Sequence, residues 1–314
     1  MKIVFTMAIP EELQKEFAGQ FKTDEIHYTD RLESFPELKE VEVIVTYGSD
    51  LTEKLIQEAT NLKWIMVYSA GVDSLPKKAI TSRQIKVTNV RGIHAYPMAE
   101  FVMAYLLDDV KQLSFFNTAQ RQKRYASEHP VVELGKKTIA VAGTGAIGIQ
   151  VARFAKMFQM KTIGFNTTGH KAESFDETYP LNNLSKSVPE VDYFVSILPK
   201  TKETDSIYGR NFFASLADHA VFINIGRGNV TAKEVLEEAI QKKAIRHFYL
   251  DVFPEEPLPK ESPLWEAENV TLTPHVSGHT DQYLKRSFPI FAENMIRFKK
   301  NESLVNEVDL KRGY

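Results

Sequence analysis

The chain has 314 residues, of which 43% are hydrophobic and 25% charged, the composition of a water-soluble folded protein with room for two domains. Lysine and arginine number 39 against 41 aspartates and glutamates, so no net positive field exists to attract nucleic acid or an anionic membrane. The lack of cysteine excludes disulfides and thiolate chemistry, and without a membrane-length apolar stretch or a secretory leader we expect a cytoplasmic protein.

Apolar strands alternate with helices through the first part of the chain. Short apolar runs predict strands at 2–7, 41–46, 62–68 and 85–89. Pro10 with two following glutamates opens a helix that reaches about residue 17, and a second helix is expected at 52–60. This alternation predicts an α/β domain with a parallel sheet.

The turn after the third strand has the sequence Ser-Ala-Gly-Val-Asp from Ser69 to Asp73. Ala70 and Gly71 leave the backbone bare, so a ligand at the carboxyl end of this strand can reach their N–H groups. A plain tight turn is the alternative interpretation.

A long helix is predicted from Pro97 to about Arg121. Its early part is apolar on more than one face, which favours burial between layers. We expect this helix to lead from a first domain into a second one that begins near Leu134.

Residues 138–148 predict a strand, a tight turn and a helix. Gly143, Gly145 and Gly148 have G-x-G-x-x-G spacing: the first allows the turn, the second lets a diphosphate approach the backbone, and the third lets the helix pack on its strand. Ala146 and Ile147 open that helix, whose free N–H groups favour an anion. The pattern indicates dinucleotide binding, because a second strand follows at 161–165.

Further strands are expected at 193–198, 220–225, 244–250 and 270–272. A helix is predicted at 231–242, with Thr231 as its cap and Glu234 completing a capping box. A last helix covers 281–300, and the residues after it are expected to return to the first domain.

Three polar side chains follow strands of the second domain. Arg227 follows the strand ending at Ile225, Glu256 lies beyond the one ending at Leu250, and His275 follows the one ending at Leu272. Because ligands bind beyond the carboxyl ends of parallel strands, we expect these three groups at one edge of one sheet. Each also has an ordinary interpretation, as a salt bridge, a solvated charge and a structural imidazole.

Five motifs in this order resemble the D-isomer-specific 2-hydroxyacid dehydrogenase family. They are the glycine turn 143–148, Leu198-Pro199, Asn-Ile-Gly-Arg-Gly at 224–228, Asp-Val-Phe-Pro-Glu-Glu-Pro-Leu-Pro at 251–259 and Thr-Pro-His-Val-Ser-Gly at 273–278. The resemblance implies two Rossmann-like or flavodoxin-like α/β domains with parallel sheets. Residues 1–98 with 287–314 would form the substrate domain, and 99–286 the inserted dinucleotide-binding domain.

The resemblance also implies an activity, the transfer of a hydride between NAD(P)H and C2 of a small 2-keto or D-2-hydroxy acid. His275 matches the acid/base, Glu256 its carboxylate partner and Arg227 the residue that binds the substrate. Ala70 and Gly71 would bind the substrate carboxylate. Asp251 corresponds to a contact with the nicotinamide carboxamide, and the motifs add further expected cofactor contacts at Leu198, Pro199, Ile225, His275 and Gly278.

The end of the second strand of the dinucleotide unit departs from the NAD pattern. Such units place an aspartate about 20 residues after the glycines to hold the ribose hydroxyls, whereas this chain has Asn166, Thr167 and Thr168, followed by His170 and Lys171. Asn166 removes a charge that would repel a 2′-phosphate, so we expect NADP(H) to be favoured over NAD(H).

Other interpretations concern neighbouring histidines and the whole protein. A metal pair of His275 and His279 is disfavoured, because no carboxylate ligand is arranged nearby. His94 either lines a cleft or is structural. The family also resembles dinucleotide-sensing corepressors with little turnover, which is the alternative function, and it suggests a homodimer through the cofactor domain.

Overall fold

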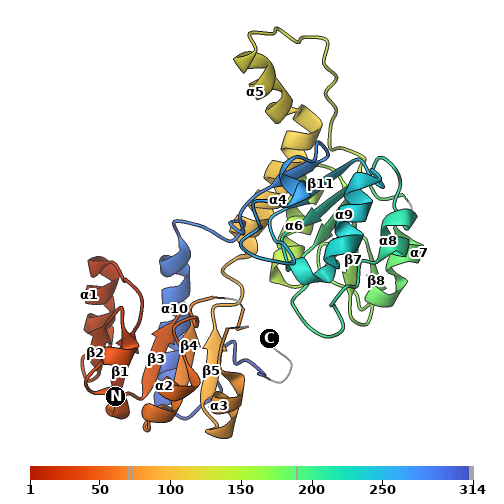
Figure 1. The fold of residues 1–314 in the computed structure, drawn as a ribbon. Helices are drawn as coiled ribbons and strands as arrows, with labels where there is room; N and C mark the ends of the chain where they lie inside the picture. The colour runs from red at the N-terminus through yellow and green to blue at the C-terminus, as the bar shows by residue number, and fades with distance from the viewer. Residues whose placement is uncertain (70, 73, 189, 311–314) are drawn as a thin grey trace. The chain divides into compact units, whose positions relative to one another are not determined.

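The chain builds two units around two parallel sheets (Figure 1). The computed structural model describes residues 1–69, 71–72, 74–188 and 190–310. One unit contains Met1–Ile93 together with the chain from Thr280 onward, and the other is His94–His279. The predicted divisions, after residues 98 and 286, lie a few residues later in the chain. The difference arises because the helix at 95–111 packs on the second sheet alone and the helix at 283–299 on the first sheet alone. The chain therefore passes from one unit to the other just before each of these helices begins.

The sheet of the first unit has five parallel strands in the order β2-β1-β3-β4-β5, which is the flavodoxin-like order. Four of the five strands were predicted. Strand β2 was missed because it lies at the sheet edge and none of its residues is buried, so it lacks an apolar run. The strands are β1 (Lys2–Phe5), β2 (Glu25–Tyr28), β3 (Val43–Thr46), β4 (Trp64–Val67) and β5 (Lys86–Asn89).

Helices cover both faces of this sheet, and alternate strand residues point into each layer. Helices α1 (Glu11–Gln20) and α10 (Tyr283–Lys299) cover one face, while α2 (Glu53–Glu58) and α3 (Lys77–Ser82) cover the other. After α10 the chain returns to the sheet, as predicted: the Val308 N–H donates to the Val87 carbonyl at 2.9 Å. Two short 3-10 helices, η1 (Leu32–Ser34) and η2 (Leu38–Glu40), complete the unit.

The second unit has a seven-stranded parallel sheet in the order β12-β11-β10-β9-β6-β7-β8. The order reverses between β6 and β9, and in open α/β sheets such a switch point is where ligands bind. The parallel α/β architecture inferred from the sequence is therefore confirmed. The strands are β6 (Thr138–Ala142), β7 (Lys161–Asn166), β8 (Glu177–Pro180), β9 (Tyr193–Ser196), β10 (Val221–Asn224), β11 (His247–Leu250) and β12 (Val270–Leu272).

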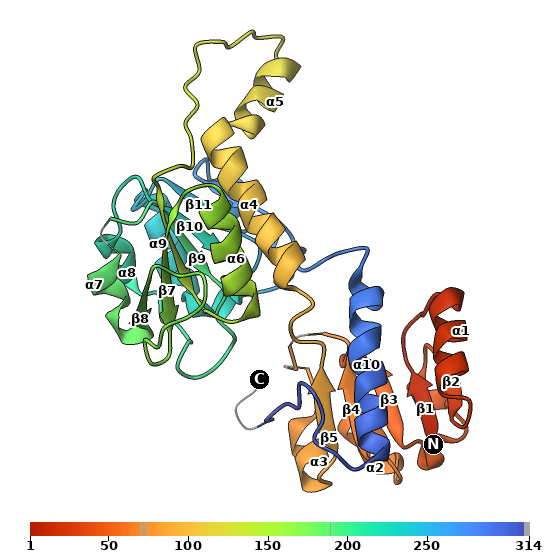
Figure 2. The same ribbon diagram turned by 180° about the vertical axis from the view of Figure 1, so that it is seen from behind.

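Helices α4 (Ala95–Lys111) and α6 (Ala146–Met157) pack side by side on one face of this sheet (Figure 2). The other face carries α7 (Leu184–Ser187), α8 (Arg210–Ser215) and α9 (Lys233–Gln241). No helix in the described part of the chain has the length and hydropathy needed to span a membrane. The remaining short 3-10 helices of this unit are η3 (Leu181–Asn183), η4 (Gly228–Val230) and η5 (Pro263–Trp265).

The prediction of one continuous helix from residue 97 to 121 is wrong. Helix α4 ends at Lys111, Gln112 adopts a left-handed conformation with φ 56°, and a separate helix α5 (Leu113–Arg121) follows. The Asp108 carboxylate accepts hydrogen bonds from the Ser114 N–H and hydroxyl, both at 2.9 Å. Asp108 thus caps the new helix, which stands away from the body of its unit (Figure 1).

The predicted capping box at the start of α9 is also wrong. The helix begins at Lys233, so its cap position is Ala232, which makes no side-chain hydrogen bond. The Thr231 hydroxyl is buried and has no hydrogen-bond partner among the described residues. The chain enters this helix one residue later than the pattern indicated, because Ala232 still has extended backbone geometry and so takes the cap position in place of Thr231.

Candidate active site

The glycine turn joins β6 to α6 at the switch point, and each glycine has a distinct surrounding. Gly143 has a φ of 105° and lies against the Ile197 carbonyl that follows β9. A Cβ on Gly148 would lie 2.0 Å from the Gly143 oxygen, whereas a Cβ on Gly145 would meet nothing within 4 Å. Gly148 therefore allows close packing of helix and turn, and Gly145 faces open space.

These surroundings fit the diphosphate of a dinucleotide. Gly145 is the N-cap of α6 and offers no side-chain cap, so the first N–H groups of the helix remain available to an anion. Ala146 is exposed and Ile147 is partly buried, directly beside that open space. A bulky side chain at residue 145 would fill the space that a bound diphosphate needs.

The loop after β7 is shaped by the Asn166 side chain. Its amide nitrogen donates to Thr144 Oγ1 at 3.2 Å and to the His170 carbonyl at 2.8 Å, and its oxygen accepts from the Gly169 N–H at 2.7 Å. Asn166 is buried, while Thr167, Thr168, His170 and Lys171 are exposed. Asn166 thus holds the start of the loop in place and leaves these four neighbours exposed.

Two of the predicted cofactor residues are buried in the protein. Leu198 is 3% exposed and Ile225 1% exposed, and their side chains belong to the two hydrophobic layers of the sheet. Any contact of these two residues with a cofactor is therefore limited to the backbone. Pro199 is exposed, and Gly278 is partly buried.

Two close backbone contacts fix the position of Arg227. A Cβ on Gly226 would lie 2.8 Å from backbone atoms of Leu198, and a Cβ on Gly228 would lie 1.9 Å from the backbone carbonyl of Phe253. The Asn224 amide also donates to the Arg227 carbonyl at 3.1 Å. The loop that carries Arg227 is thus held between the loops that follow β9 and β11.

His275 and Glu256 form the hydrogen-bonded pair that the sequence suggested. His275 Nδ1 lies 2.8 Å from Glu256 Oε2, and Glu256 Oε1 accepts from the Phe253 N–H at 2.9 Å. With Nδ1 committed to the carboxylate, Nε2 is the ring nitrogen that can exchange a proton with a substrate. The imidazole is about half exposed, at 48%, so a substrate can reach it.

Asp251 is completely buried and holds the loop that carries His275. Its carboxylate accepts from the Thr273 hydroxyl at 2.6 Å and from the N–H groups of Val276 at 2.9 Å and Ser277 at 3.0 Å. This role was not foreseen from the sequence. The contact of Asp251 with a nicotinamide carboxamide remains a prediction.

His94 is a further member of the site. It precedes α4 and packs against Gly278, where a Cβ would lie 3.2 Å from the imidazole Cδ2. Burial, together with the positive charge of Arg227, lowers the pKa of His94 to about 4. A neutral imidazole therefore lies near Arg227. The only sequence signal for this arrangement was the position of His94, three residues before Pro97.

The predicted carboxylate-binding turn belongs to the first unit. Ala70 lies outside the described residues. Gly71 is partly exposed, and its carbonyl accepts from the Ser69 hydroxyl at 2.6 Å.

A doubly wound sheet with a glycine turn at its switch point and a hydrogen-bonded histidine–carboxylate pair beyond its strands is typical of dinucleotide-dependent oxidoreductases. The sequence model described as D-isomer specific 2-hydroxyacid dehydrogenase, NAD binding domain, matches residues 103–277. The chain belongs to the D-isomer-specific 2-hydroxyacid dehydrogenase family.

Individual relatives resemble nearly the whole chain. A glyoxylate reductase of Thermococcus gammatolerans is 31% identical over 330 residues, which cover 99% of this chain and 97% of that protein. A family member from Aeromonas salmonicida has a solved structure with a TM-score of 0.88 at 31% identity, covering 98% of each chain. The NADPH-dependent glyoxylate/hydroxypyruvate reductase of Sinorhizobium meliloti gives a TM-score of 0.81 at 25% identity, covering 100% of this chain and 99% of that chain.

The protein is accordingly an NAD(P)-dependent enzyme that transfers a hydride to or from C2 of a small 2-keto or D-2-hydroxy acid. The corepressor alternative is not favoured, because the relatives are reductases and dehydrogenases.

Proposed function

We propose that this enzyme reduces a small 2-keto acid such as glyoxylate, hydroxypyruvate or pyruvate, with NADPH preferred over NADH. The observation that carries the proposal is the pairing of His275 Nδ1 with Glu256 Oε2 at 2.8 Å, at the strand edge where Arg227 is fixed. Glyoxylate reductase activity is named for the relative from Thermococcus gammatolerans.

Each side chain has a role set by its chemistry. The Arg227 guanidinium pairs with the carboxylate and the carbonyl oxygen of the substrate and so fixes the face of C2. When bound, the nicotinamide supplies the hydride to C2. His275 donates the Nε2 proton to the oxygen that becomes the hydroxyl, and Glu256 stabilises the imidazolium form before that transfer. The backbone at Gly71 binds the substrate carboxylate in this proposal.

Replacing His275 by alanine tests the acid/base assignment. We expect kcat to fall by roughly 100-fold to 10,000-fold, the usual contribution of general acid–base catalysis, while the Kd for NADPH measured by fluorescence changes little. A matching loss of cofactor affinity would sink the assignment. His247→Ala is the control, because this histidine contacts Thr271 at the opposite, amino-terminal end of the strands.

The preference for NADPH rests on the loop after β7. At the end of β7, where NAD-binding units carry an aspartate, this chain has Asn166, and the residues that follow it expose Thr168, His170 and Lys171, which offer donors to a 2′-phosphate. The relative from Sinorhizobium meliloti is NADPH-dependent. The test is the ratio of kcat/KM with NADPH and with NADH. Asn166→Asp should lower that ratio, and a clear preference of the unmodified enzyme for NADH would overturn the proposal.

We further propose that the enzyme is a homodimer and that α4 and α5 contribute to the contact. Helix α5 stands away from its unit (Figures 1 and 2), and Ala119 is its one buried residue. Leu113 on this helix and Val131 and Val132 in the following loop are each about half exposed. A nine-residue helix is marginal in water by itself, so a second copy that covers these apolar side chains supplies the missing stabilisation.

Sedimentation of Leu113→Glu against the unmodified enzyme tests the dimer. We expect the variant to shift toward a monomer. Trp265→Glu, a change at a similarly exposed apolar side chain on η5, is the control and should leave the association state unchanged. A monomeric unmodified enzyme at micromolar concentration would contradict the proposal.

A further inference from the structure

The backbone at His275 has an unfavourable conformation that hydrogen bonds to neighbouring residues stabilise. His275 has a φ of 56°, a left-handed conformation that is unfavourable for a residue with a Cβ. Its N–H donates to the carbonyl oxygens of Asp251 at 2.8 Å and Thr273 at 3.1 Å. With the carboxylate contacts described above, Asp251 alone provides most of the hydrogen bonds that hold this turn.

The chain of hydrogen bonds continues from Asp251 into helix α4. The Thr273 hydroxyl donates to Asp251 Oδ1 at 2.6 Å, and Thr273 Oγ1 also lies 2.6 Å from the Tyr105 hydroxyl oxygen. A threonine hydroxyl has one proton, and here it is given to the carboxylate. The Tyr105 hydroxyl must therefore be the donor to Thr273, so the direction of donation runs from Tyr105 through Thr273 to Asp251.

Tyr105 is held rigidly enough for this role. Its ring packs against Tyr249 with centroids 4.6 Å apart and meets Phe101 edge to face at 5.1 Å. The side chain is 6% exposed, and burial raises the pKa of its hydroxyl far above neutrality. The hydroxyl therefore stays a neutral donor over the whole working range of the enzyme.

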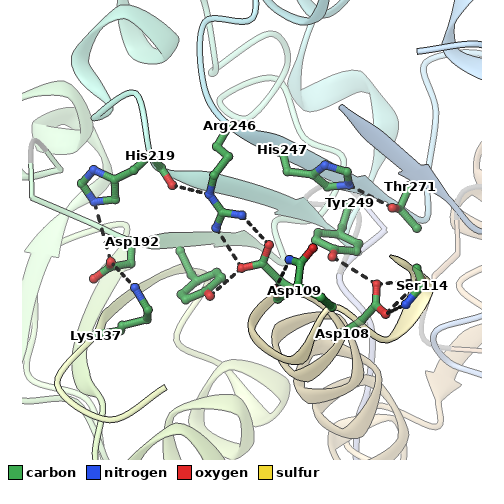
Figure 3. A network of polar contacts seen from close by, with 12 residues as sticks. Asp108, Asp109, Ser114, Lys137, Asp192, His219, Arg246, His247, Tyr249 and Thr271 are labelled. Carbon is green, nitrogen blue, oxygen red and sulfur yellow. Dashed lines mark hydrogen bonds and ion pairs between the residues drawn. The ribbon is translucent and has the colours of Figure 1, made fainter. Parts of the chain in front are cut away.

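One helical turn beyond Tyr105, an ion pair between buried Asp109 and the more exposed Arg246 fixes the register of α4 on the sheet. Asp109 lies on the same face of the helix, and its carboxylate accepts from both terminal nitrogens of Arg246, at 2.6 and 2.8 Å (Figure 3). The Tyr193 hydroxyl donates to the same carboxylate at 2.7 Å. Because Arg246 and Tyr193 precede or begin strands, α4 is fixed to the amino-terminal edge of the sheet as well as to the catalytic loop.

We propose that Tyr105 is a positioning residue for the acid/base His275 and acts through Thr273 and Asp251. This rests on the proposed function, in which His275 gives the proton to the substrate. Tyr105 donates a hydrogen bond to Thr273 Oγ1, and the threonine hydroxyl donates its own proton to the buried Asp251 carboxylate. The carboxylate in turn holds Val276 and Ser277, and with them the strained turn at residue 275.

Tyr105→Phe removes the hydroxyl and leaves the ring packing in place. We expect kcat to fall about two- to tenfold, the effect of one buried hydrogen bond, while the KM for NADPH changes by less than twofold. The solvent deuterium isotope effect on kcat should rise, because proton transfer from a less ordered His275 limits more of the rate. Tyr249→Phe is the matched control: it removes the hydroxyl of the neighbouring ring and should change neither quantity.

A double-mutant cycle tests the route through Thr273. Thr273→Val should lower kcat at least as much as Tyr105→Phe, and the double variant should be no worse than Thr273→Val alone. Thr273→Ser keeps the hydroxyl, so its solvent isotope effect should equal that of the unmodified enzyme and differ from that of Thr273→Val. This comparison is a second test of the route if Tyr105→Phe folds poorly. Independent, additive losses in the cycle would overturn the route.

The proposal fails if Tyr105→Phe has the kcat and isotope effect of Tyr249→Phe. This outcome is distinct from failure of the proposed function, which His275→Ala tests in the same assay. If His275→Ala keeps its kcat, the acid/base assignment is wrong and Tyr105 has no acid/base to position. If His275→Ala is inactive and Tyr105→Phe is normal, the positioning inference alone is wrong.

Discussion

Gly228→Ala should disable the enzyme by moving two loops apart. A Cβ at residue 228 would lie 1.9 Å from the backbone carbonyl carbon and oxygen of Phe253, where favourable contact needs about 3.5 Å. Backbone atoms cannot rotate away, so the loops must separate by roughly 1.5 Å. Arg227 lies on one of these loops and Glu256 on the other. A misplacement of about 1 Å costs roughly 100-fold in rate, equivalent to about 2.7 kcal/mol.

A graded series of glycine variants separates this effect from general destabilisation. Gly226→Ala brings its Cβ to 2.8 Å from Leu198 and should cost less, whereas Gly209→Ala meets nothing within 4 Å and serves as the control. The assay is kcat/KM for glyoxylate or the best 2-keto acid, with thermal melting to verify folding. Full activity of folded Gly228→Ala, or equal losses in all three variants, would refute the reasoning.

Three further predictions concern the cofactor turn, the ion pair of Asp109 with Arg246 and the aromatic core. Gly145→Val should weaken NADPH binding at least tenfold, measured by fluorescence, without lowering the melting temperature, because its Cβ enters open space; unchanged affinity would contradict the diphosphate site. Burial opposes ionisation of Asp109, but hydrogen bonds from Arg246 and Tyr193 outweigh it and lower its pKa. Its stabilisation is therefore present above the ordinary carboxyl pKa of 3.8 and is lost as the pH falls through the lower pKa of the folded protein. Asp109→Asn should flatten the acid limb of a plot of unfolding free energy against pH, and an unchanged limb would contradict this. Phe291→Ala removes a buried ring that packs on Phe17 and Trp64 and should cost about 3–5 kcal/mol in the first unit; calorimetry would refute this if the second unit lost stability instead.

The elements that hold the site were predictable because their signals are local. Strand β6, the glycine turn and α6 are specified by one short stretch of sequence, and the third glycine has the close contact that the motif requires. The pairing of His275 with Glu256 was predictable for a different reason. Parallel strands end at a common edge, so two residues that follow neighbouring strands β11 and β12 are brought together by the sheet itself.

The features that escaped prediction depend on distant partners. Gln112 is neither glycine nor proline, and the helix breaks there because the Asp108 carboxylate caps the next segment. In the sequence, Asp251 is only a polar residue that follows a strand. Its hydrogen-bond donors are Thr273, Val276 and Ser277, which lie more than 20 positions away along the chain. Propensity and spacing contain no information on such contacts, which form only after the strands have paired.

The discontinuous first unit has a consequence for folding during synthesis. Phe288, Phe291 and Met295 of α10 complete the aromatic layer against Phe5 and Trp64, yet they leave the ribosome after the whole of the second unit. At about 5–20 residues per second, the first five strands wait roughly 10 to 40 seconds for this helix. The contiguous second unit can fold in that interval, whereas the nascent first sheet keeps part of one apolar face exposed until the last helix is synthesised.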